Sequence, residues 1–203
     1  MILYMQQHGI SPNDLEDYNK ENIEKIYNLA KNNKVLAIGE IGLDYYWNKD
    51  NKEIQQKAFI EQIEIANSLK KPIVIHTRDA IFDTIDILKN KIECKEKGVF
   101  HCCPLNVDLV REALKLGFYI SFAGPITFKN SKNADEIIKM VPDDKFLIET
   151  DSPYLSPEPL RGTRNNSLNL KYTASKIAEV KQKSLDEIVK KAYENTKNIL
   201  KIV

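Results

Sequence analysis

Short runs of β-branched and aromatic residues alternate with longer amphipathic segments along most of the chain, and this alternation limits the possible folds more than any other feature. The runs that we predict as strands are 35–42 (VLAIGEIG), 72–77 (PIVIHT), 98–102 (GVFHC), 118–122 (FYISF) and 145–150 (KFLIET). Strands that alternate with helices form parallel sheets whose faces are covered by those helices. The sequence therefore predicts an α/β fold.

The segments around these runs place apolar residues three and four positions apart, which predicts helices. The expected helices are 19–32, 53–69, 79–89, 107–116, 133–140, 170–180 and 184–202. The last of them opens with Ser-Leu-Asp-Glu, which is a capping-box pattern. Because neither a repeat nor a linker interrupts the 203 residues, we expect a single domain over 1–203.

The composition, 42% hydrophobic and 29% charged, is typical of a globular domain. A net charge of +1 gives no field that would attract a polyanion. The three cysteines include no CxxC pair, so neither a disulfide framework nor a thiolate zinc site is indicated. No apolar run approaches the roughly 20 residues of a membrane span, and the first residues do not resemble a signal peptide. We therefore expect a cytoplasmic protein.

Four of the predicted strands end in a residue that can bind a metal ion. These residues are Glu40, His76, His101 and Asp151. A charge at the end of an apolar run costs several kcal/mol to bury unless it is paired or bound to metal, so a partner is expected for Glu40. In a parallel α/β barrel the carboxyl ends of the strands converge on one face. Carboxylates with imidazoles suit zinc, manganese or magnesium, and a metal-activated water is the natural nucleophile there.

Each of these residues also has a simpler explanation. A lone histidine on an apolar strand is more often a hydrogen-bonded core residue than a metal ligand. Asp151 precedes Ser-Pro, as a helix N-cap would, and Arg78 with Asp79 could form a surface ion pair. Taken together, the four residues favour a metal site, because two of the three histidines in the chain fall at the ends of predicted strands. His8 has no predicted strand beside it, and we interpret it as a surface or core residue.

Six motifs in order then resemble the TatD family of metal-dependent deoxyribonucleases, which are amidohydrolase-like TIM barrels. The motifs are GEIGLDYYW (39–47), PIVIHTRDA (72–80), GVFHC (98–102), GFYISFAGPITFKNS (117–131), FLIETDSPYLSPEPLRGTRN (146–165) and ENTKNIL (194–200). The resemblance implies that Glu40 bridges two metal ions. It further implies that His76 and His101 bind the second ion, and that Asp151 binds the first and orients or deprotonates the attacking water.

The resemblance also implies where a substrate would bind. Arg78, Arg161 and Arg164 are similar to positions that line the family's site, where a guanidinium can hold a phosphate through two hydrogen bonds. For the last two, a pair on the surface of a loop is an equal alternative. The aromatic residues 45–47 could stack on the bases of a single strand or pack as a lid.

The N-terminal part departs from the family pattern. Family members begin with a strand ending in a His-x-His pair that holds the first metal, and this sequence has no such motif. Its opening MQQHGISPNDLEDYN (5–19) instead resembles the family segment that reads Gly-Ile-His-Pro-His-Asp, with Ser11 and Asn13 at the positions of those two histidines. The 203 residues are also fewer than the roughly 250 of a full barrel. We therefore expect an incomplete barrel that lacks about two N-terminal βα units. A homodimer is expected to cover its open edge, and the site is expected to hold one or two divalent ions, with one favoured.

Two classes of function remain after this comparison. The first is a hydrolase of TatD type that cleaves phosphodiester bonds in DNA through a metal-activated water. The second is a catalytically impaired pseudoenzyme or binding module that retains a single metal site. A third possibility is a metal-dependent hydrolase that cleaves an amide or a lactone in place of a phosphodiester. The absent His-x-His pair favours the second class, and the complete set of Glu40, His76, His101 and Asp151 favours the first.

Overall fold

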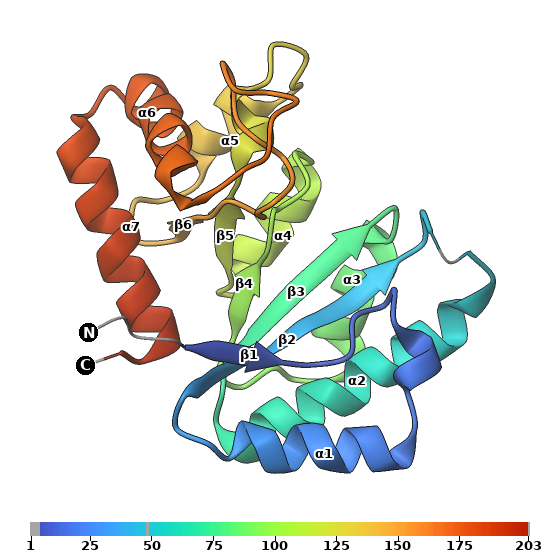
Figure 1. Cartoon of the computed structure of the whole chain (residues 1–203). Coiled ribbons are helices and arrows are strands. Elements are labelled where there is room, and N and C mark those ends of the chain that lie inside the picture. Colours follow the sequence, from blue (N-terminus) through green and yellow to red (C-terminus); the bar gives the residue numbers. More distant parts are fainter. Residues whose placement is uncertain (1–4, 48, 203) are drawn as a thin grey trace. The chain divides into compact units, whose positions relative to one another are not determined.

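The computed structural model describes residues 5–47 and 49–202, and the chain divides into two compact units, residues 1–100 and 101–203. Each unit combines parallel strands with helices (Figure 1). The two units are described one at a time.

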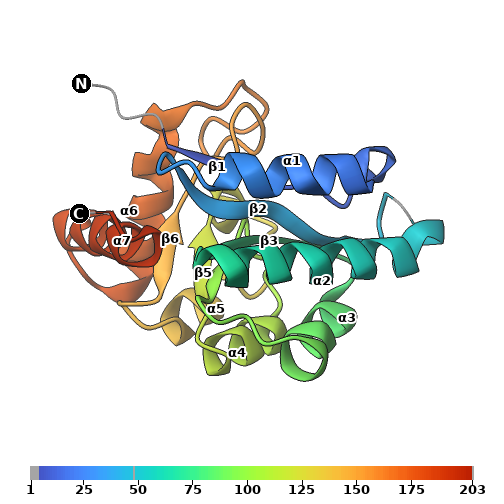
Figure 2. The same cartoon turned by 90° about the horizontal axis from the view of Figure 1, so that it is seen from below.

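The first unit contains four neighbouring parallel strands in chain order. They are β1 (Gln6–His8), β2 (Val35–Asp44), β3 (Ile73–Arg78) and β4 (Gly98–Phe100). Its helices are α1 (Lys20–Ala30), α2 (Lys52–Leu69) and α3 (Ile81–Asp86), the last continued by a π-helical turn over Ile87–Lys91. Helices α1 and α2 lie beside one another along β2, as two perpendicular views show (Figures 1 and 2).

Strand β2 is the central element of the first unit, and its side chains are buried on both faces. Ile38, Ile41 and Leu43 have no exposed surface, which suits a parallel strand covered by helices. Two buried glutamines of α2 hold the neighbouring backbone. Gln55 accepts a hydrogen bond from the Asp44 amide at 2.7 Å and donates to the Asp44 carbonyl at 3.0 Å. Gln62 likewise accepts a hydrogen bond from the Ile10 amide and donates one to the Ile10 carbonyl. Helix α2 therefore holds both the end of β2 and the segment after β1.

The second unit contains the parallel pair β5 (Tyr119–Phe122) and β6 (Phe146–Ile148). Its helices are α4 (Val107–Lys115), α5 (Ala134–Met140), α6 (Leu170–Lys181) and α7 (Leu185–Leu200). Helix α7 begins with the predicted capping box, in which Ser184 and Glu187 satisfy each other's backbone amides. From α7, the amide of Asn195 donates to the carbonyls of Asp143 and Phe146 at 2.9 and 2.8 Å. The motif at 194–200 therefore has a structural role, since it attaches α7 to β6.

The predicted strands and helices are confirmed, with three differences. Strand β2 does not end at residue 42 but continues to Asp44, because Leu43 and Asp44 pair with Thr77 and Arg78 of β3. Strand β1 was not predicted, since its sequence QQH carries no β signal. His8 closes this strand, so the interpretation that it has no strand end was wrong. The helix expected over 79–89 begins at Ile81 and ends in the π-helical turn.

The fold agrees with the predicted incomplete α/β barrel. The described residues form six strands with helices between them, and a full barrel of this class has eight. Among the described residues, no helix is both long and apolar enough to span a membrane.

Candidate metal centre

Glu40 lies inside β2 rather than at its end. It stands between Ile38 and Ile41, where the pairing of β2 with β3 shifts register. Such an irregularity redirects a side chain at the edge of a site. The Glu40 side chain is half-buried.

The same strand ends in a second carboxylate that contacts a predicted metal ligand. The Oδ2 atom of Asp44 lies 2.9 Å from Nε2 of His76, which belongs to the neighbouring strand β3. The Asp44 side chain is only 1% exposed, and its Oδ1 accepts the backbone amides of Tyr46 and Trp47 at 2.9 and 3.0 Å. Burial by itself would raise the pKa of Asp44. The hydrogen bonds from Trp47 and His76 outweigh it and hold that pKa below its usual value.

Asn13 reaches the same carboxylate. Its Nδ2 donates to Asp44 Oδ2 over 3.4 Å, and its backbone amide donates to the Ser11 hydroxyl at 3.2 Å. Asn13 occupies one of the two positions at which family members have histidine. The structure therefore brings that position to the Asp44 and His76 pair, although the residue there is an amide.

The second unit contains a matching pair. His101 follows β4 in a turn, and its Nδ1 lies 2.5 Å from Oε2 of Glu149. The other oxygen of Glu149 accepts the Cys102 amide at 2.6 Å. Burial would raise the pKa of Glu149, but the hydrogen bond and the charge of His101 lower it below the usual value.

Asp151 lies on the opposite side of the same imidazole. Its Oδ1 is 3.8 Å from Nε2 of His101, beyond hydrogen-bonding distance. The Asp151 side chain is 33% exposed. The carbonyl of Asp151 accepts the Tyr154 amide in a turn, and no helix begins there, so the N-cap alternative was wrong.

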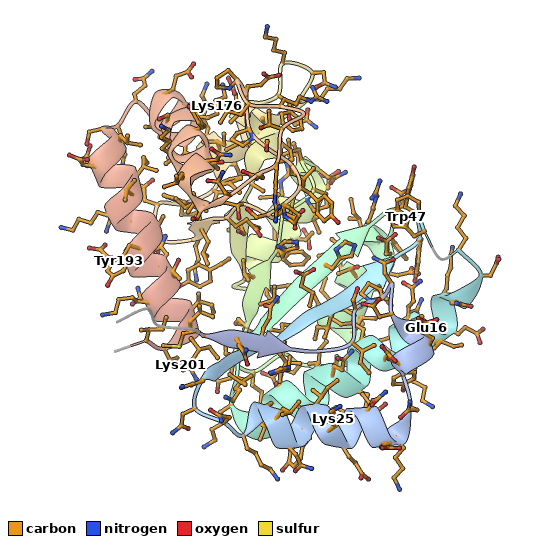
Figure 3. All side chains as sticks on the ribbon, viewed as in Figure 1. Glu16, Lys25, Trp47, Lys176, Tyr193 and Lys201 are labelled. Carbon is orange, nitrogen blue, oxygen red and sulfur yellow. The ribbon has the colours of Figure 1, made fainter. Side chains whose placement is uncertain are left out.

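The aromatic residues after β2 divide into two kinds. Tyr45 is buried, and its hydroxyl donates to Asp83 at 2.7 Å. Tyr46 and Trp47 are 47% and 66% exposed, with rings packed edge to face at 4.8 Å. The Arg78 guanidinium lies 3.8 Å from the centre of the Tyr46 ring. Figure 3 shows Trp47 projecting at the ends of β2 and β3. Tyr45 is therefore packed inside the protein, whereas Tyr46 and Trp47 are accessible to solvent.

The other predicted substrate residues lie in the loop after β6. Arg161 is exposed, donates to Asn130 at 3.2 Å and stacks over the Phe128 ring at 4.2 Å. Arg164 is exposed in the same loop.

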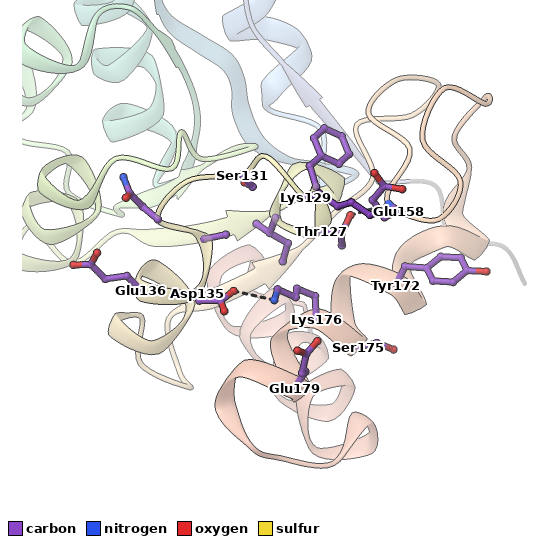
Figure 4. A pocket seen from close by; sticks show the side chains of 14 residues that line it. Thr127, Lys129, Ser131, Asp135, Glu136, Glu158, Tyr172, Ser175, Lys176 and Glu179 are labelled. Atoms are coloured by element: carbon purple, nitrogen blue, oxygen red, sulfur yellow. Dashed lines mark hydrogen bonds and ion pairs between the residues drawn. The ribbon is translucent and has the colours of Figure 1, made fainter.

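A surface pocket of about 780 Å³ also lies in the second unit, between the segment 126–136 and α6 (Figure 4). Lys176 and Asp135 form an ion pair of 2.9 Å across it. None of the predicted site residues is among its lining residues. This pocket is therefore separate from the strand ends that carry the histidines.

Imidazoles oriented by carboxylates are what a transition-metal or zinc site requires, so the donors fit a divalent ion. Within the described ranges, no three histidine, cysteine, aspartate or glutamate side chains are grouped closely enough to hold an ion. Each unit instead contains one oriented imidazole with carboxylates near it. Asp44 and Glu149 were missed at the level of sequence. The only available signal was that each is an acidic residue close to a predicted ligand, in GEIGLD and in IETD.

Parallel βα units with oriented histidines and acidic residues at the strand ends define the class of metal-dependent α/β-barrel hydrolases. The chain belongs to the family described as TatD related DNase, whose model matches residues 4–201. It is 43% identical over 194 residues to YabD of Bacillus subtilis, an uncharacterized metal-dependent hydrolase, covering 96% of this chain and 76% of that protein. It is 38% identical over 188 residues to the likewise named YcfH of Escherichia coli K12, covering 93% and 69%.

Solved structures agree with this assignment. The crystal structure of YjjV, a TatD homolog from Escherichia coli, matches with a TM-score of 0.91 at 24% identity, covering 98% of this chain and 77% of that one. A hydrolase of the TatD family from Entamoeba histolytica matches with a TM-score of 0.81 at 25% identity, covering 96% and 74%. The family model and the relatives confirm the predicted family, and the solved structures confirm the barrel-type fold.

Proposed function

We propose that this chain hydrolyses phosphodiester bonds in DNA with a divalent metal ion, in the cytoplasm. The observation that carries the proposal is the pair of imidazoles, one in each unit, that are each held by a buried or half-buried carboxylate. A metal-binding histidine almost always donates its other ring N–H to a carboxylate, a carbonyl or water, and it gains orientation and basicity from that contact. The relatives' names say only that they are metal-dependent hydrolases, and the description of the family as TatD related DNase supports DNA as the substrate.

The proposed ligands are those predicted from the sequence: Glu40, His76, His101 and Asp151. A bound ion would lower the pKa of the attacking water and offset negative charge on the phosphate. Asp151 would accept the proton of that water, a role that suits a carboxylate one-third exposed to solvent. Zinc, manganese and magnesium all suit this donor set.

The arginines would hold the substrate. The Arg78 guanidinium stacks on Tyr46 and is exposed, so it can turn its donors toward a phosphate. Arg161 and Arg164 are equally accessible from their loop. The exposed rings of Tyr46 and Trp47 offer a surface on which a base of single-stranded DNA can stack.

Release of nucleotides from a short single-stranded oligonucleotide tests the proposal. The chelator-treated protein is assayed alone and after addition of Mg²⁺, Mn²⁺ or Zn²⁺. Release that depends on the metal is expected. A folded protein that releases no nucleotide with any of the three ions would contradict the proposal.

A specific observation favours the alternative of an impaired enzyme or binding module with a single metal site. The sequence has no His-x-His pair to bind the first ion, which leaves only Glu40 and Asp151 of the proposed ligands for it. Two carboxylates without imidazoles are a sparse donor set for a transition metal or zinc. Binding of the oligonucleotide without any release of nucleotides would support this alternative.

The absence of the His-x-His pair predicts the metal content. We expect protein purified without chelator to contain nearer one divalent ion than two per chain, because the first ion lacks two of its family ligands. Elemental analysis against protein concentration measures the ratio. A clean ratio of two would show that other groups replace the missing histidines.

We further propose a homodimer. Among the described strands, β1 pairs only with β2, so no described strand covers its second edge, and such an edge is a site for pairing with another chain. A second copy of the chain could cover this edge. Light scattering at micromolar concentration is expected to give twice the mass of the chain, and a compact monomer would count against the dimer.

A further inference from the structure

Asp151 belongs to the segment 150–154, which we call the Asp151 turn, and its backbone has an unusual conformation. Its φ is +56°, in the left-handed region that residues other than glycine rarely adopt. A conformation of this kind persists only where the surrounding structure holds it. Within the turn, the Tyr154 amide donates to the Asp151 carbonyl at 2.9 Å. This bond is local, so the attachment of the turn to the second unit depends on other residues.

Asn165, in the loop before α6, supplies this attachment. Its side chain is buried, since the residue is only 3% exposed. The Nδ2 atom donates to the Thr150 carbonyl at 2.7 Å and to the Tyr154 carbonyl at 2.8 Å. The backbone amide of Asn165 donates to the Pro153 carbonyl at 3.0 Å. One residue therefore holds carbonyl groups on both sides of Asp151.

The orientation of the Asn165 amide is fixed by two donors on its other side. Its Oδ1 accepts the Asn166 amide and the Nδ2 of Asn169, each at 2.9 Å. Asn169 is itself buried and ends the 3₁₀ turn that leads into α6. An NH₂ group cannot accept from these donors, so the Nδ2 of Asn165 must face the carbonyls of the Asp151 turn. The side chain thus joins this turn to the start of α6.

We propose that Asn165 is a positioning residue that fixes the backbone of the Asp151 turn and thereby the place of the Asp151 carboxylate. That carboxylate has its Oδ1 3.8 Å from Nε2 of His101. Asn165 is buried and acts through Asp151. The proposal rests on the proposed role of Asp151 in hydrolysis, but the conformation of the turn is a property of the chain that can be measured without metal or substrate.

Two substitutions of Asn165 remove the contacts in different ways. Asn165→Asp keeps the size of the side chain but places an oxygen against the carbonyl oxygens of Thr150 and Tyr154, so two hydrogen bonds become repulsive contacts. Asn165→Ala removes the same bonds without adding a charge. Asn166→Ala is the matched control, because this neighbouring asparagine is exposed and its side chain accepts the Leu168 amide at 3.0 Å in the turn before α6.

Amide hydrogen exchange in the metal-free protein, followed by NMR, tests the conformational part of the proposal. Both Asn165 variants should exchange the Ser152 and Tyr154 amides at least about 10-fold faster than the wild type. The Ile120 amide, which donates to the Lys145 carbonyl at 2.9 Å in the sheet, should exchange at the wild-type rate. The control variant should change none of these rates. Unchanged exchange in the turn, or an equal increase at Ile120, would overturn the proposal.

Steady-state hydrolysis of the oligonucleotide by the metal-loaded variants measures the consequence for catalysis. The kcat of both Asn165 variants should fall by about 100-fold, since a misplacement of about 1 Å can cost that much. KM should change by less than about threefold, because Arg161 keeps its own contacts with Asn130 and Phe128. The control variant should keep both constants.

The two measurements separate a positioning role from a purely structural one. A residue that only stabilised the fold would lower the urea midpoint and leave the kcat of the folded protein unchanged. An opened turn with wild-type kcat would therefore overturn the positioning role. If the wild-type protein hydrolyses no DNA and the variants still open the turn selectively, the proposed function fails, while the hold of Asn165 on the Asp151 turn is confirmed.

Discussion

Replacement of Glu40 by glutamine is expected to lower the rate of DNA hydrolysis by about 10³-fold or more, because a metal ion contributes several kcal/mol of transition-state stabilisation. The amide keeps the size of the side chain but loses the charge that would hold the ion. The half-buried position of Glu40 in β2 tolerates the amide, so the variant should fold. Nucleotide release at saturating metal measures the effect, with circular dichroism as the check on folding.

Glu53→Gln is the matched control for this prediction. Glu53 is an exposed carboxylate in the first turn of α2, in the same unit as Glu40. The loss of one surface charge there should change neither folding nor hydrolysis by more than about twofold, since surface substitutions of this kind have small effects. A Glu40→Gln variant that is as active as Glu53→Gln would show that Glu40 does not bind a required ion.

Replacement of Gly42 by alanine is expected to lower the free energy of unfolding by about 4 kcal/mol, which is among the largest effects of single substitutions. A Cβ atom at this position would stand 2.0 Å from the carbonyl oxygen of His76, and the backbone has a φ of +141° that other residues rarely adopt. Strands β2 and β3 must separate to admit the methyl group. Urea unfolding followed by circular dichroism measures the loss.

Gly162→Ala separates the clash from the backbone strain. Gly162 also has a positive φ, +88°, but nothing lies within 4 Å of a Cβ built there. Its substitution should therefore cost only about 1 kcal/mol. Equal losses at the two glycines would mean that the contact with His76 does not limit the packing of β2 against β3.

The alternation of strands and helices was predictable because it rests on local patterns. The apolar run that leads to Glu40 and the capping box at Ser184 each signal their element within a few residues. Strand β1 carries no such signal, since its three residues are polar and it forms by pairing with β2. The extension of β2 to Asp44 likewise depends on pairing, here with Thr77 and Arg78 of β3. Tertiary contacts of this kind override the local pattern.

The sequence predicts the candidate ligands of the site, but it does not predict the carboxylates that contact the two histidines. His76 and His101 stand out because few other histidines exist and both follow apolar runs. The contact between His76 and Asp44 depends on the register of β2 against β3, and that between His101 and Glu149 spans 48 positions from 101 to 149. Neither spacing follows from sequence periodicity. The roles of the four predicted ligands and three arginines stay predictions, and the Glu40→Gln variant tests the first of them.

The most direct test of phosphodiester hydrolysis is the mass of the nucleotides released in H₂¹⁸O. A single-stranded oligonucleotide is incubated with chelator-treated protein to which Mn²⁺ has been returned, and the products are analysed by mass spectrometry. If a metal-activated water attacks phosphorus, each released nucleotide should carry one ¹⁸O on its phosphate, and omission of the metal should abolish release. Unlabelled nucleotides, release without metal, or no release from the folded protein would contradict the proposed function.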